Sequence, residues 1–449
     1  MRSNWQVARL GDYCTKIGSG STPRGGNNVY LESGPYAFIR SQHIYNDQFK
    51  KEGIVYINEE SAEKLNCVAV EENDILLNIT GDSVARVCLA PNELLPARVN
   101  QHVAIIRVNP DELDSRFVRY YLVTPFMQNH MMALASTGGT RKALTKAMIE
   151  AFDIPKPELK VQKKIADILS SFDKKISFNR KTNETLEQIA QAIFKSWFVD
   201  FDPVKARIAG SQPECMNEKI AELFPDSYEN SALGPIPKGW KVNTMKDICE
   251  LITKGTTPRL SETEEAEDIP CVPFIKVKDI SDDGYVLRDS LELIPESVHK
   301  KQLKRSILKA NDLLFSIAGT IGRVAVVDPD LNDSNANQAV AILRLKNKDK
   351  YLCLSLYNLK SLRVQKTIAT QVVQGVQANA SLKNMGDILI IEPTQEILNE
   401  WNNIIYPLFQ KQCMLNSQIR MLSELRYTLI PKLISGEIAI VEGDEQEVF

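Results

Sequence analysis

The sequence predicts an α+β protein in which one domain occurs twice and each copy is followed by a long coiled-coil helix. Two observations predict this fold class. The loop TKIGSGSTPR (15–24) is nearly repeated as ELITKGTTPR (250–259). In addition, the stretch that follows each predicted domain carries apolar residues at alternating spacings of three and four, which is the pattern of a coiled coil.

The repeated loop is the first of several matches that keep the same order in both halves of the chain. NDILLNITGDSVARV (73–87) matches NDLLFSIAGTIGRV (311–324), and NQHVAIIRV (100–108) matches NQAVAILRL (337–345). Chance similarity between turn-rich loops does not produce so many matches in register. The pattern therefore indicates a duplicated domain and not the short-period stacking of a solenoid.

Each copy has the same internal order of predicted elements. Runs of β-branched and aliphatic residues, such as ILLNIT (75–80) and HVAIIRV (102–108), predict strands. A segment of helical period follows, at 114–135 in the first copy and at 350–369 in the second. A glycine-containing loop and a short strand that ends in proline complete the copy. We therefore expect two α+β domains of about 155 residues each.

The predicted organisation has six segments. They are a first domain at 1–157, a first long helix at 158–200, a connector at 201–239, a second domain at 240–394, a second long helix at 395–436 and an acidic tail at 437–449. The connector is rich in Pro, Gly, Ser and acidic residues, and we expect it to be irregular with one short helix around MNEKIAELF (216–224).

The coiled-coil prediction depends on two apolar seams. The first consists of Val161, Ile165, Ile168, Phe172, Ile176, Leu186, Ile189, Ile193 and Trp197, and the second of Ile397, Trp401, Ile404, Leu408, Leu415, Ile419, Leu422, Leu429 and Leu433. Asn179 and Asn183 lie on or near the first seam, where polar side chains cost stability and fix register. Exposure to solvent is the alternative for these two residues. Packing of each helix on its own domain is the alternative to a coiled coil.

Composition restricts the function classes. The net charge of −3 gives the whole chain no electrostatic footprint for nucleic acid, so an anionic partner must meet a local patch or be held with help from other subunits. No apolar run approaches the roughly 18–20 residues that span a bilayer, and the first residues lack the apolar core of a signal peptide. We therefore expect a cytoplasmic protein. The 8 cysteines are scattered, and no Cys or His spacing fits a zinc site.

Motifs for catalysis are mostly missing. The sequence contains no GxxxxGK[ST] loop, no GxSxG elbow and no Asn/Asp-Pro-Pro-aromatic tetrad of amino-methyltransferases. Asp153 with Glu158 and Lys160 has a spacing like that of nucleases, which could hold a divalent metal. The second copy lacks this spacing, and Glu158 suits the dipole of a helix start, so we expect no catalytic residue and no metal site.

Polar residues in glycine-bordered loops recur at matching points of both copies. Such loops can bring backbone amides, arginines and side-chain amides close to phosphates and base edges. Each residue taken singly also has a structural explanation, since Thr-Pro is a common turn. We predict contacts to DNA at Thr22, Pro23, Arg24, Arg40, Arg86, Asn100, Gln101, Thr140, Arg141, Lys142, Thr257, Pro258, Arg259, Lys276, Arg323, Asn337, Gln338, Gln374 and Gln377.

Taken together, these motifs resemble the specificity subunit of type I restriction–modification systems. The resemblance covers nearly the whole chain. It depends on the two TPR loops, the NDILL/NDLLFSIAGTIGRV and NQ segments, SWFVDFDP (196–203), the connector ELFPDSYENSALGPIPKGW and LIPKLISGEI near the end. It implies two pseudo-twofold-related target recognition domains joined by two long antiparallel coiled-coil helices. Each domain would read one half of a split, asymmetric sequence in double-stranded DNA.

The resemblance also implies a subunit that is not itself an enzyme. Such a subunit docks two methyltransferase subunits and, through them, two ATP-dependent motor–nuclease (restriction) subunits, so that S-adenosylmethionine, ATP and Mg belong to the partners. SETEEAED (261–268) has no acidic counterpart in the first copy, and we therefore expect two different half-sites. A stand-alone DNA methyltransferase or nuclease, and a scaffold that holds protein partners without DNA, are the alternatives.

Overall fold

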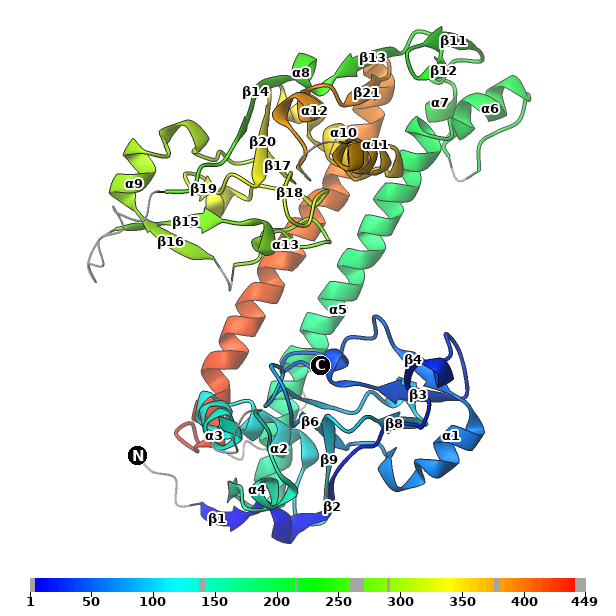
Figure 1. The fold of residues 1–449 in the computed structure, drawn as a ribbon. Coiled ribbons are helices and arrows are strands. Elements are labelled where there is room, and N and C mark those ends of the chain that lie inside the picture. The colour runs from blue at the N-terminus through cyan, green and yellow to red at the C-terminus, as the bar shows by residue number, and fades with distance from the viewer. Residues whose placement is uncertain are drawn as a thin grey trace, which may run out of the picture. The chain divides into compact units, whose positions relative to one another are not determined.

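The computed structural model describes residues 5–136, 142–214, 216–258, 270–288, 291–374 and 379–440, with only the backbone of Asn27 and of 372–374 (Figure 1). The chain divides into two compact units, Met1–Asn179 with Gln418–Phe449 and Arg180–Ser417. Each unit therefore contains one of the two domains together with one part of each long helix.

The first domain contains two four-stranded sheets. One has the strand order β2-β9-β6-β7 and is antiparallel, whereas in the other, β4-β3-β8-β5, the neighbours β3 and β8 run parallel. The strands are β2 (Cys14–Ser19), β3 (Tyr36–Ile39), β4 (Val55–Ile57), β5 (Ala69–Val70), β6 (Ile75–Asn78), β7 (Val87–Leu89), β8 (Ala97–Val99) and β9 (Val103–Val108). A separate antiparallel pair joins β1 (Gln6–Arg9) to β10 (Asp153–Lys156).

The central strands of the first domain are buried on both faces. Ile75 and Leu77 of β6 belong to the core that the helices cover, whereas Leu76 belongs to the core that the second sheet covers. Because successive side chains of a strand point to opposite faces, a strand between two cores reads as an unbroken apolar run. This explains the unbroken apolar runs ILL (75–77) in β6 and VAII (103–106) in β9.

Four helices complete the first domain: α1 (Glu59–Lys64), α2 (Ser115–Leu122), α3 (Pro125–Ser136) and α4 (Lys146–Glu150). The predicted helical segment 114–135 is therefore two helices. Asp114 caps the first of them by accepting from the N–H groups of Arg116 and Phe117. Pro125 separates the two, since proline disfavours helical backbone in the residue before it and suits the first position of a new helix.

The second domain repeats this topology, which confirms the predicted duplication. Its sheets have the orders β14-β20-β17-β18 and β16-β15-β19, again with one parallel pair, β15 and β19. A register shift near the start of β2, at Cys14/Lys16, recurs in β14 at Cys249/Leu251. The strands are β13 (Lys241–Thr244), β14 (Cys249–Lys254), β15 (Cys271–Ile275), β16 (Glu292–Pro295), β17 (Leu313–Ser316), β18 (Val324–Val326), β19 (Asn335–Ala336), β20 (Val340–Leu345) and β21 (Leu389–Glu392).

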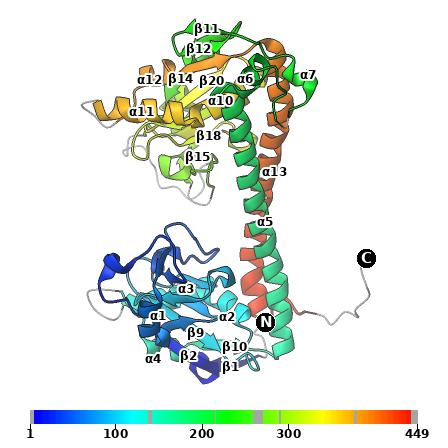
Figure 2. The ribbon, with the colours of Figure 1, turned by 90° about the vertical axis from the view of Figure 1, so that its right-hand side faces the viewer.

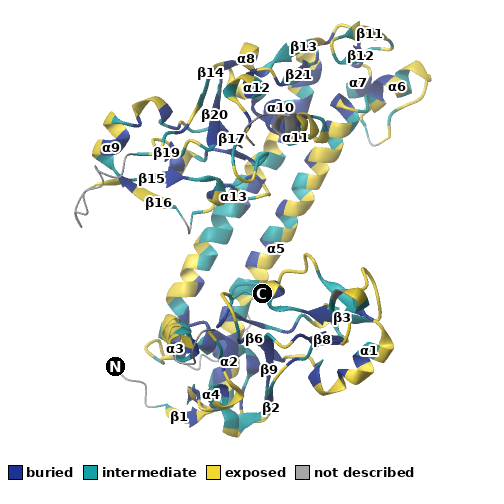
Figure 3. Cartoon of the chain, in the orientation of Figure 1, coloured by how far each residue is buried: buried dark blue, intermediate teal, exposed yellow. Residues whose placement is uncertain are grey.

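The helices of the second domain are α8 (Met245–Ile248), α9 (Glu296–Lys301), α10 (Lys348–Lys360), α11 (Leu362–Gln374) and α12 (Leu382–Gly386). The strand pair of β13 and β21 corresponds to that of β1 and β10. Figure 3 shows the central strands of the two domains, such as β9 and β20, in the colour of buried residues, whereas an edge strand such as β16 is largely exposed.

The connector is more regular than the sequence predicts. Besides the expected short helix, α7 (Glu218–Ala221), it contains α6 (Asp202–Ile208) and a hairpin of β11 (Tyr228–Ser231) and β12 (Gly234–Pro237). The predicted short helix is therefore confirmed, whereas the expectation that the rest of the connector is irregular was wrong. A proline in the first turn of α6 favours the helix start, and Gly234, with φ +87°, lets the chain turn tightly into β12.

The two predicted long helices are confirmed as α5 (Leu159–Phe198) and α13 (Gln395–Ile434), of 40 residues each. They run antiparallel within each unit, as the side-by-side ribbons of Figure 2 show. In the first unit Leu169 shares a core with Ile430, and in the second the rings of Trp197 and Trp401 lie 6.1 Å apart. The helices therefore pack against each other as well as against the domains.

The buried stripe of α5 differs in part from the predicted seam. Leu169, Ile176, Asn183, Ala190 and Trp197 are buried at intervals of seven residues. A spacing of seven residues is the coiled-coil repeat. At two places two apolar residues are adjacent, and the buried member is Leu169 or Ala190 and not the predicted Ile168 or Ile189.

The prediction that Ile168 and Ile189 belong to the seam was wrong. Ile168 and Ile189 remain 39% and 43% exposed, respectively. The two asparagines, by contrast, lie in the seam and not in solvent. Asn179 Nδ2 donates to Gln418 Oε1 at 3.2 Å, and Asn183 Nδ2 donates to Asn416 Oδ1 at 2.7 Å.

Each domain is anchored to α5 by a tyrosine hydroxyl and a cation that meet one carboxylate. In the first unit, Tyr120 Oη donates to Asp173 at 2.6 Å, and Arg119 and Arg426 form ion pairs with the same side chain. In the duplication α13 is the counterpart of α5, so a carboxylate on α13 would be expected in the second unit. The carboxylate of the second unit nevertheless also belongs to α5.

That second carboxylate is Glu187. Tyr357 Oη donates to it at 3.3 Å, Lys360 Nζ at 2.8 Å and Gln412 Nε2 at 3.2 Å. Burial, together with the nearby Glu187 charge, raises the pKa of Tyr357, so that its hydroxyl stays a donor.

Candidate nucleic-acid interface

In the first domain, the loop after β2 is bonded to the turn between β8 and β9. The Gly20 N–H donates to Val103 O at 2.8 Å, and the Ser21 N–H donates to Val99 O at 3.0 Å. The hydroxyl of Thr22 donates to Oε1 of Gln101. We call residues 20–22 and 99–103 the first clasp.

The second domain repeats these bonds in the second clasp, residues 255–257 and 336–340. The Gly255 N–H donates to Val340 O at 3.0 Å, and the Thr256 N–H donates to Ala336 O at 3.0 Å. The hydroxyl of Thr257 donates to Oε1 of Gln338. The two stretches that the sequence matches in pairs, TPR and NQ, are thus brought together in space in both copies.

The glycine of each clasp is required by close packing. A Cβ atom on Gly20 would lie 2.1 Å from Val99 O, and one on Gly255 would lie 2.0 Å from Ala336 O. Both separations are far inside van der Waals contact. Only glycine therefore lets the loop backbone approach the turn closely enough to make the bonds of the clasp.

The asparagine and glutamine of each clasp have different roles. Asn100 Oδ1 accepts from the N–H of His102 at 3.2 Å, and Asn337 Oδ1 accepts from that of Ala339 at 3.2 Å, so both asparagines shape their own turn. Gln101 and Gln338 are exposed. The glutamines are therefore better placed than the asparagines to reach a ligand, while DNA contact at all four stays a prediction.

The matched arginines differ in their partners. The guanidinium of Arg86 lies over the ring of Tyr45, 4.6 Å from its centroid. Arg323, at the same place in the second domain, donates to Asp282 at 2.7 Å and to the carbonyl of Ile280 at 3.0 Å. The positive charge of Arg323 is thus partly neutralised by a carboxylate, whereas Arg86 has no carboxylate partner among the residues that the structure describes.

A second matched pair, Arg40 and Lys276, is also engaged within the chain. Arg40 Nη2 donates to Gly53 O at 2.7 Å. Lys276 Nζ lies 2.5 Å from a carboxylate oxygen of Glu292, and this hydrogen bond lowers the pKa of Glu292. Contact of either cation with DNA would therefore compete with a partner that it already has.

The remaining predicted contacts fall into three groups. Arg24 and Lys142 are exposed, Pro23 is buried and Pro258 is half-buried. Only the backbone of Gln374, at the end of α11, is described. The last group, Thr140, Arg141, Arg259 and Gln377, lies outside the described residues.

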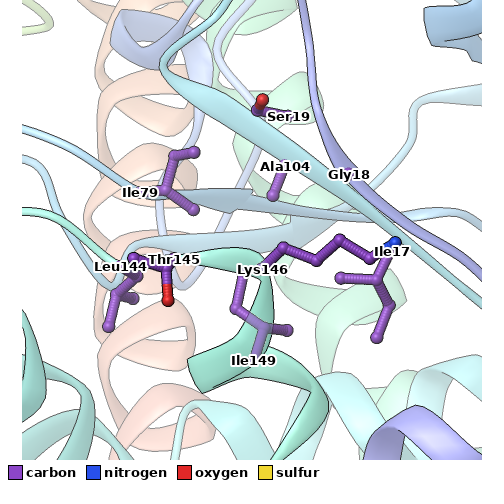
Figure 4. A pocket seen from close by; sticks show the side chains of 9 residues that line it. All are labelled: Ile17, Gly18, Ser19, Ile79, Ala104, Leu144, Thr145, Lys146 and Ile149. Atoms are coloured by element: carbon purple, nitrogen blue, oxygen red, sulfur yellow. The ribbon is translucent and has the colours of Figure 1, made fainter.

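A pocket of about 160 Å³ lies in the first domain beside β2, β9 and α4 (Figure 4). Its lining is mostly apolar, with Ile17, Ile79 and Ile149 beside Thr145 and Lys146. None of the predicted DNA contacts lines it. Its volume is below the roughly 300 Å³ at which small-molecule sites begin, so it offers no room for a nucleotide cofactor.

Within the described ranges, no group of three or more His, Cys, Asp or Glu side chains is placed to hold a metal ion. No helix in the same part of the chain is both long and apolar enough to cross a bilayer.

Two functional candidates were not among the predicted contacts: His102 in the first clasp and Thr80 beside it. The Thr80 hydroxyl lies 2.6 Å from His102 Nδ1, and His102 Nε2 lies 3.2 Å from Nε2 of Gln101. A signal for them was available. Within otherwise matching segments, NIT is aligned with SIA and NQH with NQA. Thr80 and His102 are thus each replaced by alanine in the second copy.

Comparison with known proteins agrees with the duplicated clasps. The family model described as the type I restriction modification DNA specificity domain matches residues 2–188 and again residues 237–418. The chain belongs to this family. Both copies of the domain are thus matched, as the internal repeat predicts.

Relatives in this specificity family span nearly the whole chain. The HindI specificity subunit of Haemophilus influenzae is 26% identical, with 97% of this chain and 100% of the relative covered. The MjaIX specificity subunit of Methanocaldococcus jannaschii is 26% identical, with 98% and 94% covered. The crystal structure of the type I system S subunit from M. genitalium has the same fold, with a TM-score of 0.56, 16% identity and 96% of both chains covered.

Proposed function

We propose that this chain is the DNA-recognition subunit of a type I restriction–modification complex and reads a bipartite, asymmetric duplex sequence with one domain per half-site. The observation that carries the proposal is the pair of clasps. Each clasp holds an exposed glutamine amide by the same set of bonds on the same sheet scaffold. A rigid amide is a suitable donor and acceptor for a base edge.

The surroundings of the clasps support two different half-sites. Arg86 stacks on a tyrosine in the first domain, whereas Arg323 is paired with Asp282 in the second. His102 of the first domain is replaced by Ala339. A common scaffold that displays different side chains is the arrangement by which two domains can read two unrelated sequences.

The proposal assigns no catalytic step to this chain. Two methyltransferase subunits supply methyl transfer from S-adenosylmethionine, and two motor–nuclease subunits supply ATP- and Mg-dependent cleavage, all in the cytoplasm. Exposed apolar side chains on the long helices support docking of partners. Phe178 (62%) and Met421 (62%) are exposed in the first unit, and Tyr406 (42%) and Met414 (45%) in the second.

Methylome sequencing tests this function directly. Cells that carry the complete gene cluster should methylate a single sequence with two defined blocks and an unread spacer, and deletion of this gene alone should abolish the modification. Methylation that persists after the deletion, or a continuous target without a spacer, would contradict the proposal.

Exchange of one domain tests the assignment of half-sites. Replacement of residues 240–394 by the same region of a relative should change one half of the methylated sequence and leave the other unchanged. The matched control replaces residues 5–157 and should change the opposite half. If both halves change in either chimera, the two domains are not independent readers.

A further inference from the structure

Three side chains of the first clasp and Thr80 beside it form one hydrogen-bonded chain. The Thr22 hydroxyl donates to Oε1 of Gln101, whose Nε2 lies 3.2 Å from His102 Nε2. The other ring nitrogen of His102, Nδ1, lies 2.6 Å from the Thr80 hydroxyl. The amide of Gln101 is therefore held at both ends, by Thr22 and by His102.

The direction of the bonds follows from the donors available. Since Oε1 of Gln101 accepts from Thr22, its Nε2 is the end that donates, and His102 Nε2 must accept. The ring proton of His102 is then on Nδ1 and is donated to the oxygen of Thr80. Two hydrogens remain for a ligand: the second N–H of Gln101 and the hydroxyl hydrogen of Thr80, which has no other acceptor among the described residues.

The second domain cannot build this arrangement. The N–H of Ile79 donates to the His102 carbonyl at 2.9 Å, and the N–H of Ile317 donates to the Ala339 carbonyl at 2.8 Å, which establishes that His102 corresponds to Ala339. By the same register Thr80 corresponds to Ala318. Within the described part of the second domain, the amide of Gln338 is thus held at Oε1 alone.

We propose that His102 is a positioning residue that fixes the amide of Gln101, and that with Thr80 it determines the base specificity of the first half-site. The inference rests on the proposed function. The two remaining hydrogens lie on neighbouring groups and favour base edges with acceptors, such as N7 and O6 of guanine or O4 of thymine. The second domain reads its half-site without this pair.

The test is methylome sequencing of cells that carry the whole gene cluster with variants at these positions. His102→Ala should relax at least one position of the first half-site, with discrimination against the wrong base reduced about tenfold or more. The second half-site, read by the same molecule, should be unchanged and serves as the internal control. Thr80→Val, which keeps the shape and loses the hydroxyl, should relax the same half-site.

Rescue variants separate positioning from a structural role. His102→Gln places an acceptor where Nε2 lies and should restore discrimination, whereas His102→Asn keeps only a donor where Nδ1 lies and should not. The double variant Ala318→Thr with Ala339→His should alter base preference only in the second half-site. None of these base preferences should move if His102 merely stabilises the fold.

The outcomes distinguish this inference from the proposed function. If the wild-type complex methylates no bipartite sequence, both are overturned. If the wild type behaves as proposed but His102→Ala and Thr80→Val leave the first half-site unchanged, only the role of His102 is overturned. Equal rescue by His102→Asn and His102→Gln would likewise overturn positioning through Gln101.

Discussion

At the scale of single residues, the clasp glycines are the most constrained positions described. Gly20→Ala would place a methyl carbon 2.1 Å from Val99 O, so the first clasp must open. We expect a loss of about 1–3 kcal/mol in the free energy of unfolding, as for other overpacked sites, together with loss of methylation by the assembled complex. Chemical unfolding and methylome sequencing measure the two effects.

Gly18 provides a matched control for this substitution. A Cβ on Gly18 would meet nothing within 4 Å, although this glycine lies in β2, only two residues before Gly20. Gly18→Ala should therefore keep both stability and methylation close to wild type. A Gly20→Ala protein as stable and as active as Gly18→Ala would show that the clasp is not needed.

The matched arginines should contribute unequally to DNA affinity. Arg86 stacks on Tyr45, whereas Arg323 is paired with Asp282, so a phosphate gains more from Arg86. In the assembled complex, Arg86→Ala should reduce the slope of log affinity against log salt by about one, and Arg323→Ala should reduce it less. Fluorescence anisotropy at several salt concentrations measures both slopes.

Asp282→Asn is the complementary variant for this comparison. This variant removes the carboxylate that pairs with Arg323. The charge of Arg323 is then available to a phosphate, and the salt dependence of binding should become steeper. Wild-type slopes for both Arg86→Ala and Arg323→Ala, with no effect of Asp282→Asn, would mean that neither arginine meets phosphate.

Sequence comparison within the chain found most of the first clasp but not all of it. It selected Thr22, Asn100 and Gln101 because their counterparts are identical in the second copy. His102 and Thr80 escaped because similarity between copies was the criterion, whereas residues that distinguish two half-sites must differ between copies. The bonds of His102 also depend on a loop that lies about 20 residues away in the chain, which spacing alone does not reveal.

At the scale of elements, the anchor at Glu187 predicts a dependence of stability on pH. Burial alone would raise the pKa of Glu187, but the Lys360 charge and hydrogen bonds from Lys360, Gln191 and Gln412 outweigh burial and lower it. A carboxyl whose folded-state pKa is depressed stabilises the fold above its ordinary value of 4.5 and loses that contribution as pH falls through the folded-state value.

Glu187→Gln should therefore be less stable than wild type at pH 7, and the difference should shrink as the pH falls below 4.5. Chemical unfolding across this range measures it. Glu184→Gln, at an exposed position on the same helix, should match wild type throughout. A constant difference between Glu187→Gln and wild type at all pH values would mean that ionisation of Glu187 does not stabilise the anchor.

Periodicity predicted the long helices well and their buried stripe less well. Apolar residues stand next to each other at Ile168–Leu169 and Ile189–Ala190, so two neighbouring stripes satisfy the same spacing rule. Which stripe is buried depends on the partner helix and on the domain packed beside it, and neither is visible in a local pattern. The same limit applies to the connector, whose hairpin is short and only half-buried.

At the scale of the whole molecule, the continuity of α5 and α13 predicts that helix length controls the unread spacer. Four residues inserted after Thr182 and four after Ser417 would lengthen both antiparallel helices by about 6 Å and keep the seam nearly in phase. We expect both half-site sequences to be kept and the spacer to grow by one or two base pairs, at about 3.4 Å each.

Methylome sequencing of the insertion variant reads the spacer length directly. Insertion of two residues at both points is the control, because it rotates the apolar stripe by about half a turn and should destroy activity. An active four-residue insertion with an unchanged spacer would mean that the helices do not set the distance.

The origin of both anchoring carboxylates in α5 bears on how new specificities are inherited. Tyr357 and Lys360 belong to the second domain, but their acceptor Glu187 precedes the connector. Recombination that replaces only the second domain therefore combines the imported domain with the Glu187 that the recipient gene encodes. A fragment that imports the first domain with α5 carries Tyr120 and Asp173 together. Because that fragment also replaces Glu187, first-half specificities should be drawn from donors whose α5 keeps an acidic residue at this position, and second-half specificities from donors that supply a hydroxyl and a cation for it.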